Sequence, residues 1–135
     1  MKKLFALMLL AVIISSCSLD DGTNFHFEAV PATGATLPDS FQLDETYEIK
    51  VQYVRPTSCH FFEGYDYRKT GTNERTITLV TSVFDDPNCR ELDEELEVSF
   101  DFIVINTGTY TFRFWQGKDA NGNDTYLTYE VPVTE

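Results

Sequence analysis

The sequence predicts an all-β fold, a sandwich of two antiparallel sheets with about seven strands, over residues 24–135. Three observations support this prediction. Apolar and polar residues alternate with a period of two, as strands with one buried face require, and a helical period is almost absent. Turn residues separate the alternating runs. Aromatic residues make up 14% of the chain, which is enough to fill the core of one domain.

The N-terminal half of the domain supplies four of the expected strands. A short strand is expected over 24–29, and longer ones are expected over 47–53, 61–67 and 77–83. In the strand over 47–53, aromatic and β-branched residues alternate with Glu, Lys and Gln, which predicts one buried and one solvated face.

The C-terminal half supplies three more strands, over 94–105, 109–115 and 124–133. Asn121-Gly122 between the last two is the strongest short signal for a hairpin. Helix is expected at most as one turn near 87–94. The apolar faces of these strands consist of Leu96, Val98, Phe100, Phe102, Val104, Tyr110, Phe112, Phe114, Leu127, Tyr129, Val131 and Val133.

The segment 106–112, with Gly108 and Tyr110, resembles the Gly-x-Tyr-x-Cys sequence at the start of strand F in immunoglobulin-like domains. In that family the tyrosine hydroxyl bonds back to the backbone as a tyrosine corner. Phe112 stands where the core Cys would be, and the strand over 47–53 has no Cys either. The resemblance therefore implies an immunoglobulin-like sandwich over residues 24–135 and not an antibody-type domain. Such folds host many functions, mostly binding and adhesion.

Residues 1–16 have the composition of a secretory signal peptide. Lys2 and Lys3 form the positive start, an apolar run covers 4–14, and the small residues Ser15 and Ser16 follow. The apolar run is about half the roughly 20 residues that a membrane-spanning helix needs. We therefore expect the chain to be exported and residues 1–16 to be removed.

The next residue, Cys17, predicts a lipid anchor. Ile14-Ser15-Ser16-Cys17 resembles the lipobox of bacterial lipoproteins, in which the Cys thiol receives a diacylglyceryl group and the new amino terminus is acylated. The resemblance implies stable anchoring, because each buried methylene contributes about 0.8 kcal/mol and several acyl chains are attached. Residues 17–23 then form a short tether. An ordinary signal peptide with a coincidental Cys is the alternative.

The residues after Cys17 bear on the membrane that holds the anchor. In lipoproteins, Asp directly after the Cys often retains the protein in the inner membrane, and here that position is Ser18. The sequence therefore favours the outer membrane. The segment Leu19-Asp20-Asp21-Gly22 also resembles an acidic tether that directs some lipoproteins to the cell surface, and a periplasm-facing location is the alternative.

The two remaining cysteines, Cys59 and Cys89, are expected to form a disulfide, because an exported chain folds in an oxidising compartment. A rival interpretation combines them with His26 and His60 in a zinc site, but no spacing typical of zinc ligands supports it. No metal or other cofactor is therefore expected.

Charge and motifs exclude several function classes. The net charge is −12, and loss of Lys2 and Lys3 with the signal peptide makes the mature chain two charges more negative. Such a chain would be repelled by nucleic acid. No motif of a nucleophile elbow, zinc protease, phosphate-binding loop or dinucleotide site is present, so the sequence does not indicate an enzyme. The acidic runs at 85–88 and 91–97 are expected to be solvated surface, and a patch that binds cations or a basic partner is the alternative.

The candidate ligand-binding residues are Trp115, Arg113 and Tyr126. If Tyr110 and Phe112 point into the core, strand parity turns Arg113 and Trp115 outward, and the same logic turns Tyr126 outward on the next strand. Two aromatic rings with one guanidinium suit stacking on sugars or anchoring a protein. In the alternative interpretation, Trp115 folds over the end of the sheet against the loop that carries Cys59.

A second candidate is the hairpin from Asp119 to Asp124, which has oxygen-bearing side chains in the spacing of a calcium loop. Asp124 stands where such a loop has Gly, so a polar hairpin tip is the simpler interpretation. The sequence thus predicts a lipid-anchored, non-catalytic binding module for an envelope protein or a glycan. The alternatives are a structural accessory subunit of an envelope complex and a small hydrolase with a carboxylate site.

Overall fold

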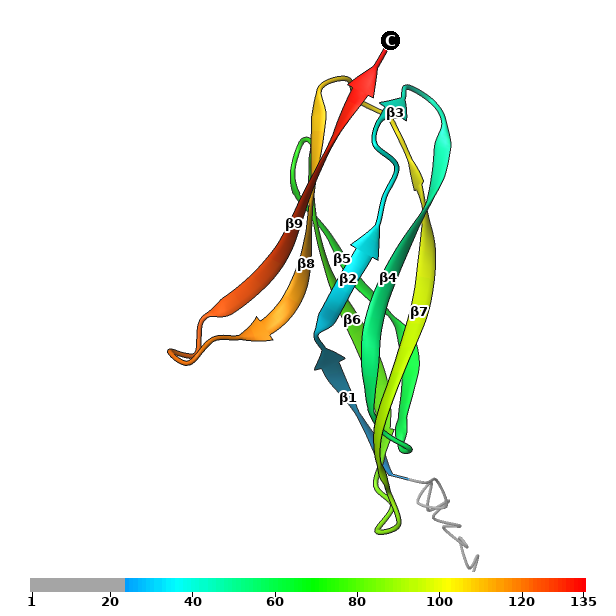
Figure 1. The fold of residues 1–135 in the computed structure, drawn as a ribbon, viewed down its shortest axis with the longest axis vertical. Coiled ribbons are helices and arrows are strands. Elements are labelled where there is room, and N and C mark those ends of the chain that lie inside the picture. The colour runs from blue at the N-terminus through cyan, green and yellow to red at the C-terminus, as the bar shows by residue number, and fades with distance from the viewer. Residues whose placement is uncertain (1–23) are drawn as a thin grey trace, which may run out of the picture.

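The computed structural model describes residues 24–135, and within them every regular element is a β-strand (Figure 1). The signal peptide, Cys17 and the tether lie outside the described residues. None of the described segments forms a helix with the length and apolarity to cross a bilayer. The nine strands are β1 (Phe25–Val30), β2 (Ala32–Thr36), β3 (Phe41–Gln42), β4 (Thr46–Thr57), β5 (His60–Gly71), β6 (Glu74–Phe84), β7 (Glu91–Ile103), β8 (Thr109–Lys118) and β9 (Asp124–Thr134).

The strands form two sheets. Sheet A has six strands in the order β1-β6-β8-β9-β3, with β5 on the other edge of β6, and sheet B has three in the order β2-β4-β7. The predicted all-β sandwich is therefore confirmed. Most neighbours are antiparallel, but β8 pairs with β6 in parallel, and β3 pairs with β9 in parallel. The β6–β8 pair is parallel because β7, which lies in sheet B, reverses the chain once between them.

The core lies between the inner faces of the two sheets. Its centre is an aromatic cluster in which Phe41 and Phe102 contact Tyr110 and Phe112, with ring centroids 5.0–6.0 Å apart. The other core residues are Val30, Ala32, Ile49, Val51, Tyr53, Ile77, Leu79, Val104, Phe114 and Val131. The apolar faces expected from strand parity are thus the faces that pack inward.

All seven expected strands are present, with ends that differ by a few residues, and β2 and β3 are additional. The segment near 87–94 is a turn that leads into β7 and contains no helix. The predicted tyrosine corner is also present. The Tyr110 hydroxyl accepts hydrogen bonds from the backbone N–H groups of Asn106 (2.9 Å) and Ile105 (3.3 Å).

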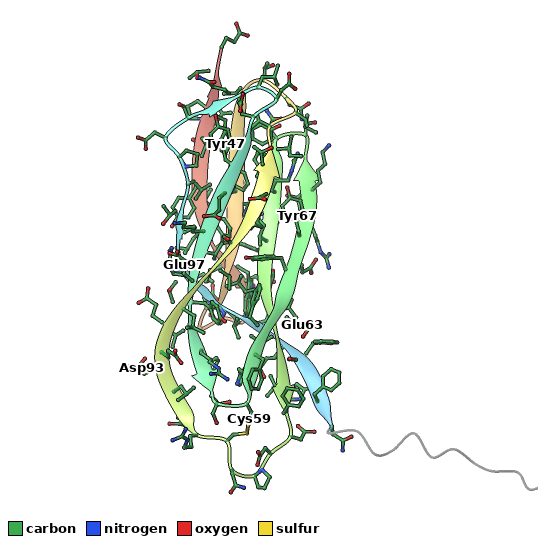
Figure 2. All side chains as sticks on the ribbon, turned by 90° about the vertical axis from the view of Figure 1, so that its right-hand side faces the viewer. Tyr47, Cys59, Glu63, Tyr67, Asp93 and Glu97 are labelled. Atoms are coloured by element: carbon green, nitrogen blue, oxygen red, sulfur yellow. A yellow bond between two sulfur atoms is a disulfide. The ribbon has the colours of Figure 1, made fainter. Side chains whose placement is uncertain are left out.

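The sandwich is elongated, and its two ends differ (Figures 1 and 2). β1 begins at the end that also holds Cys59, whereas the C-terminus lies at the opposite end. At the Cys59 end, the chain crosses from sheet B to sheet A between β4 and β5, and back between β6 and β7. The confirmed Cys59–Cys89 disulfide joins these two crossings.

Sheet A forks along β6. The N-terminal half of β6 pairs with β8, and its C-terminal half pairs with β1. The hairpin formed by β8 and β9 therefore leaves the body of the sandwich where β1 takes its place (Figure 1). At the fork, Gly117 has a φ of 108°, a backbone conformation that glycine adopts freely and that a residue with a side chain adopts only with strain.

Candidate binding surface

The three predicted ligand-binding residues lie together on the outer face of sheet A, the face that points away from sheet B. Arg113 pairs in register with Thr76 of β6, and Trp115 pairs with Tyr126 of β9. Paired residues share a face, and the core residues Phe112 and Phe114 alternate with them on β8. Figure 1 shows that this part of the hairpin stands clear of sheet B.

The side chain of Arg113 stacks on Tyr126. Its guanidinium carbon is 4.1 Å from the centroid of the Tyr126 ring, which is a close cation–π contact. The same guanidinium is 4.0 Å from the Glu74 carboxylate on β6. Both contacts fix the planar group over the sheet while leaving it in part exposed. The plane of the Arg113 guanidinium thus forms a second flat surface next to the Tyr126 ring.

Trp115 is held by the hairpin itself. Its indole Nε1 donates a hydrogen bond to Asp124 Oδ1 at 3.0 Å, and Lys118 Nζ donates to the same oxygen at 2.8 Å. The bond from Lys118, and then the bond from Trp115, lower the pKa of the Asp124 carboxyl below its ordinary value. The indole is therefore oriented by its own hairpin rather than by the loop that carries Cys59.

Polar side chains surround these three residues on the outer face. Arg68 and Thr76 continue the row of Arg113 and Thr128 across four strands. Arg68 forms a fork-like pair with Asp66, with nitrogen–oxygen distances of 3.0–3.2 Å. The result is an aromatic and guanidinium surface with hydroxyl and charged groups along its border.

The hairpin tip satisfies its own polar groups. Asp119 Oδ1 accepts the backbone N–H groups of Asn121 and Asn123, each at 2.9 Å, and the Asp124 carboxylate is occupied by Trp115 and Lys118. Both carboxylates of the candidate calcium loop therefore serve the turn. Residues 24–135 contain no group of three or more His, Cys, Asp or Glu side chains placed to hold a metal ion.

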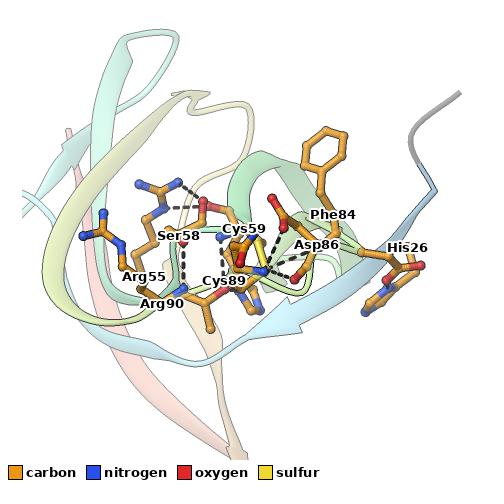
Figure 3. The surroundings of a disulfide bond; sticks show 12 residues. His26, Arg55, Ser58, Cys59, Phe84, Asp86, Cys89 and Arg90 are labelled. Atoms are coloured by element: carbon orange, nitrogen blue, oxygen red, sulfur yellow. Dashed lines mark hydrogen bonds and ion pairs between the residues drawn. A yellow bond between two sulfur atoms is a disulfide. The ribbon is translucent and has the colours of Figure 1, made fainter.

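The rival zinc interpretation is wrong for the cysteines, because both sulfurs are used in the disulfide (Figure 3). Two hydrogen bonds join Ser58 and Arg90 beside the disulfide. The Ser58 backbone N–H donates to the Arg90 carbonyl at 2.9 Å, and the Arg90 backbone N–H donates to Ser58 Oγ at 3.0 Å. Arg55 adds hydrogen bonds to the carbonyls of Ser58 (3.0 Å) and His60 (2.6 Å). The surroundings of the disulfide are thus a network that closes the end of the sandwich.

Beside the disulfide, a hydroxyl, an imidazole and a carboxylate follow one another. Thr57 Oγ1 lies 2.7 Å from Nδ1 of the buried His60, and His60 Nε2 lies 3.4 Å from Glu28 Oε1. The hydroxyl also accepts the backbone N–H of Cys59 at 3.1 Å. Since this oxygen holds the turn between β4 and β5, the arrangement serves the local structure.

One surface feature was not predicted. Four phenylalanines, Phe25, Phe27, Phe61 and Phe84, form a chain of ring contacts with centroids 5.5–5.9 Å apart. They lie on the outer face of sheet A at the Cys59 end, and we call them the aromatic patch. A shallow hollow of about 330 Å³ adjoins them, with Phe27 as a wall, Val80 and Gly64 among its lining, and Glu63 and Asp66 beside them.

Comparison of the chain with protein-family models, with curated proteins and with solved structures gave no match in any of the three. The function proposed below accordingly rests on the sequence and on the geometry of residues 24–135.

Proposed function

We propose that this protein is a lipid-anchored component of the bacterial cell envelope. The signal peptide and the lipobox ending in Cys17 support an acylated, palmitate-bearing amino terminus. Ser18 and the acidic tether after it support the outer membrane and exposure at the cell surface, with the periplasm-facing side as the alternative. The domain over 24–135 would then be held within a short distance of the bilayer.

We further propose that the domain is a non-catalytic binding module whose ligand surface is the outer face of the β8–β9 hairpin. The observation that carries this proposal is the stack of Arg113 on Tyr126 beside the oriented indole of Trp115. Preorganised flat groups lose little conformational freedom on binding, which favours recognition.

The chemistry of this surface favours a glycan ligand over a protein ligand. Sugars present flat C–H faces that stack on aromatic rings, and their hydroxyls bond to charged and hydroxyl groups of the kind that Arg68, Thr76 and Thr128 provide along the border. A protein ligand anchored on the same rings is the second possibility. Neither requires a metal or another cofactor.

A glycan array with purified protein tests the ligand surface. Trp115→Ala and Tyr126→Ala are each expected to lower the affinity for the captured glycan about 5- to 150-fold, since loss of a stacked aromatic ring costs about 1–3 kcal/mol. Phe25→Ala, which removes an exposed ring at the other end of sheet A, is the matched control. If the array is blank and crosslinking in the envelope captures one stoichiometric partner, the protein is an accessory subunit or a protein binder.

Incorporation of radiolabelled palmitate tests the anchor separately. The intact chain is expected to incorporate label and to fractionate with the outer membrane, and Cys17→Ala is expected to abolish both. An unlabelled chain that is released in soluble form would contradict the anchor while leaving the glycan proposal open to its own test.

A further inference from the structure

The aromatic patch is exposed although it consists of large apolar side chains. Phe25, Phe27 and Phe61 are 53%, 61% and 48% exposed, respectively, and all three point away from sheet B. The ring of Phe84 links Phe25 to Phe61. Arg55 caps the far side of Phe61, with its guanidinium carbon 4.7 Å from the ring centroid. A contiguous group of exposed rings of this kind marks a surface that contacts something apolar.

The position of the patch in the chain indicates what it contacts. The first described residue, Asn24, is fixed at the patch because its carbonyl accepts the backbone N–H of Asp85 at 2.9 Å. The tether over residues 17–23 ends at this point, and it spans at most about 25 Å when fully extended. A lipid-anchored Cys17 would therefore keep the aromatic patch within about 25 Å of the bilayer.

We propose that the aromatic patch rests in the interfacial layer of the bilayer that holds the anchor. This inference rests on the proposed lipid anchor. Amphipathic surfaces that lie in the membrane interface bury side chains such as Phe, Trp and Leu about 5–10 Å into the boundary between headgroups and acyl chains. In the strand register, Phe25 pairs with Phe84 of β6 and Phe27 pairs with Ser82. Arg113 pairs with Thr76, nearer the other end of β6. At about 3.4 Å per residue, Arg113 is about 20–27 Å farther along the sheet. Trp115 follows Arg113 by two residues on the parallel strand β8, so it and its partner Tyr126 are about 14–20 Å from the patch, beyond the depth to which the rings would sink.

The charges beside the patch predict which lipids it prefers. The neighbouring acidic groups, Glu63 and Asp66 in the rim of the hollow and Asp85 and Asp86 in the loop after β6, outnumber the guanidinium of Arg55 that contacts Phe61. Anionic headgroups would be repelled by these carboxylates and by the net negative charge of the chain. The patch is therefore expected to bind neutral phosphatidylcholine or phosphatidylethanolamine surfaces through burial of its rings, and to bind phosphatidylglycerol surfaces less well.

Depth-dependent tryptophan quenching tests this proposal. The chain beginning at Cys17, with Cys59 and Cys89 oxidised, is coupled through its Cys17 thiol to a maleimide lipid in phosphatidylcholine vesicles with brominated acyl chains. The reporter is Phe25→Trp combined with Trp115→Phe, and the unmodified chain, whose single tryptophan is Trp115, is the matched control. We expect blue-shifted emission and several-fold stronger quenching at position 25 than at position 115. Phe27→Ser with Phe61→Ser in the reporter chain should remove the difference.

Equal quenching at the two positions, with circular dichroism unchanged, would overturn the proposal. So would a concentration-dependent dimer in solution that the two serine substitutions dissolve, since a second copy would then cover the patch. Because the coupling is chemical, the result does not depend on lipidation in the cell. Failure of the anchor itself is recognised separately, by absence of palmitate from Cys17.

Discussion

At the scale of single residues, Tyr65 is an unusual member of the core. Its ring packs against Phe62 and Phe100 with centroids 5.1 and 5.2 Å away, but its buried hydroxyl has no hydrogen-bond partner among residues 24–135. Burial, and to a lesser degree Tyr53, raise the pKa of this phenol from 10.0 to about 12. Removing this hydroxyl from water without a compensating hydrogen bond therefore lowers the free energy of unfolding.

We expect Tyr65→Phe to leave the fold intact and to raise the free energy of unfolding by up to about 1 kcal/mol at neutral pH, because the orphan hydroxyl is removed. The wild-type chain should also lose stability as the pH rises from about 10 to about 12. In that range the unfolded phenol ionises while the folded one stays protonated. Urea unfolding at pH 7 and near pH 11 checks both effects, and the substituted chain should lose less stability at high pH. A lower stability of Tyr65→Phe at pH 7 would contradict this account.

Tyr110 is the opposite case, because its buried hydroxyl is satisfied by two backbone donors. Tyr110→Phe leaves the N–H groups of Ile105 and Asn106 without this acceptor and should destabilise the protein by about 1 kcal/mol. Urea unfolding measures the change. Tyr126→Phe is the control, since its ring lies on the outer face. Equal effects of the two substitutions would show that the tyrosine corner adds nothing to stability.

At the scale of elements, strand parity was a reliable guide where a strand was long. The faces predicted for the strands that became β4, β7, β8 and β9 are those that pack in the core. β2 was not predicted because Ala-Thr-Gly-Ala-Thr carries no large apolar side chain, and β3 has only two residues. The parallel contact of β6 with β8 joins distant segments, so no local pattern could indicate it.

β1 shows how tertiary context decides which face of a strand is buried. Its alternation places Phe25 and Phe27 on one side, which local reasoning would bury. Val30 at the end of the strand is buried instead, so parity turns both phenylalanines outward, and Glu28 faces His60.

For the candidate site, parity correctly placed Arg113, Trp115 and Tyr126 on one face. The bond from Trp115 to Asp124 lies next to a register shift between Trp115 and Gly117, for which the sequence carries no signal.

The β8–β9 hairpin therefore yields a prediction about Asp124. Lys118 is the larger cause of its lowered pKa, so Lys118→Ala should raise the pKa of Asp124 toward its ordinary value. Since the pKa is depressed in the folded chain, the contact is present at neutral pH and is lost as the pH falls through that pKa. NMR titration of the Asp124 carboxyl and of the Trp115 indole N–H should show one shared midpoint, higher in Lys118→Ala. Lys69→Ala is the control, and separate midpoints would contradict the shared bond.

At the scale of the whole molecule, the two ends of the sandwich are closed by different means. The end with the C-terminus is held by the tyrosine corner and by the β3–β9 pair, next to the aromatic centre of the core. The other end is held where the chain crosses twice between the sheets, by the Cys59–Cys89 disulfide and the bonds between Ser58 and Arg90. If Cys17 carries the proposed lipid anchor, the end with the disulfide is the one that faces the bilayer.

Removing the disulfide should therefore weaken one end of the molecule more than the other. With a separation of 30 residues, Cys59→Ala with Cys89→Ala is expected to cost roughly 3.5–4 kcal/mol of global stability by the chain-entropy model. In native-state hydrogen exchange, the amides of Ser58, Phe84 and Arg90, which bond around the crossings, should lose more protection than that of Asn106 at the tyrosine corner. Ser18→Ala, a substitution in the tether, is the control. A uniform loss of protection along the sandwich would show that the two ends unfold as one cooperative unit, and that the crossings have no local role beyond the loop that the disulfide closes.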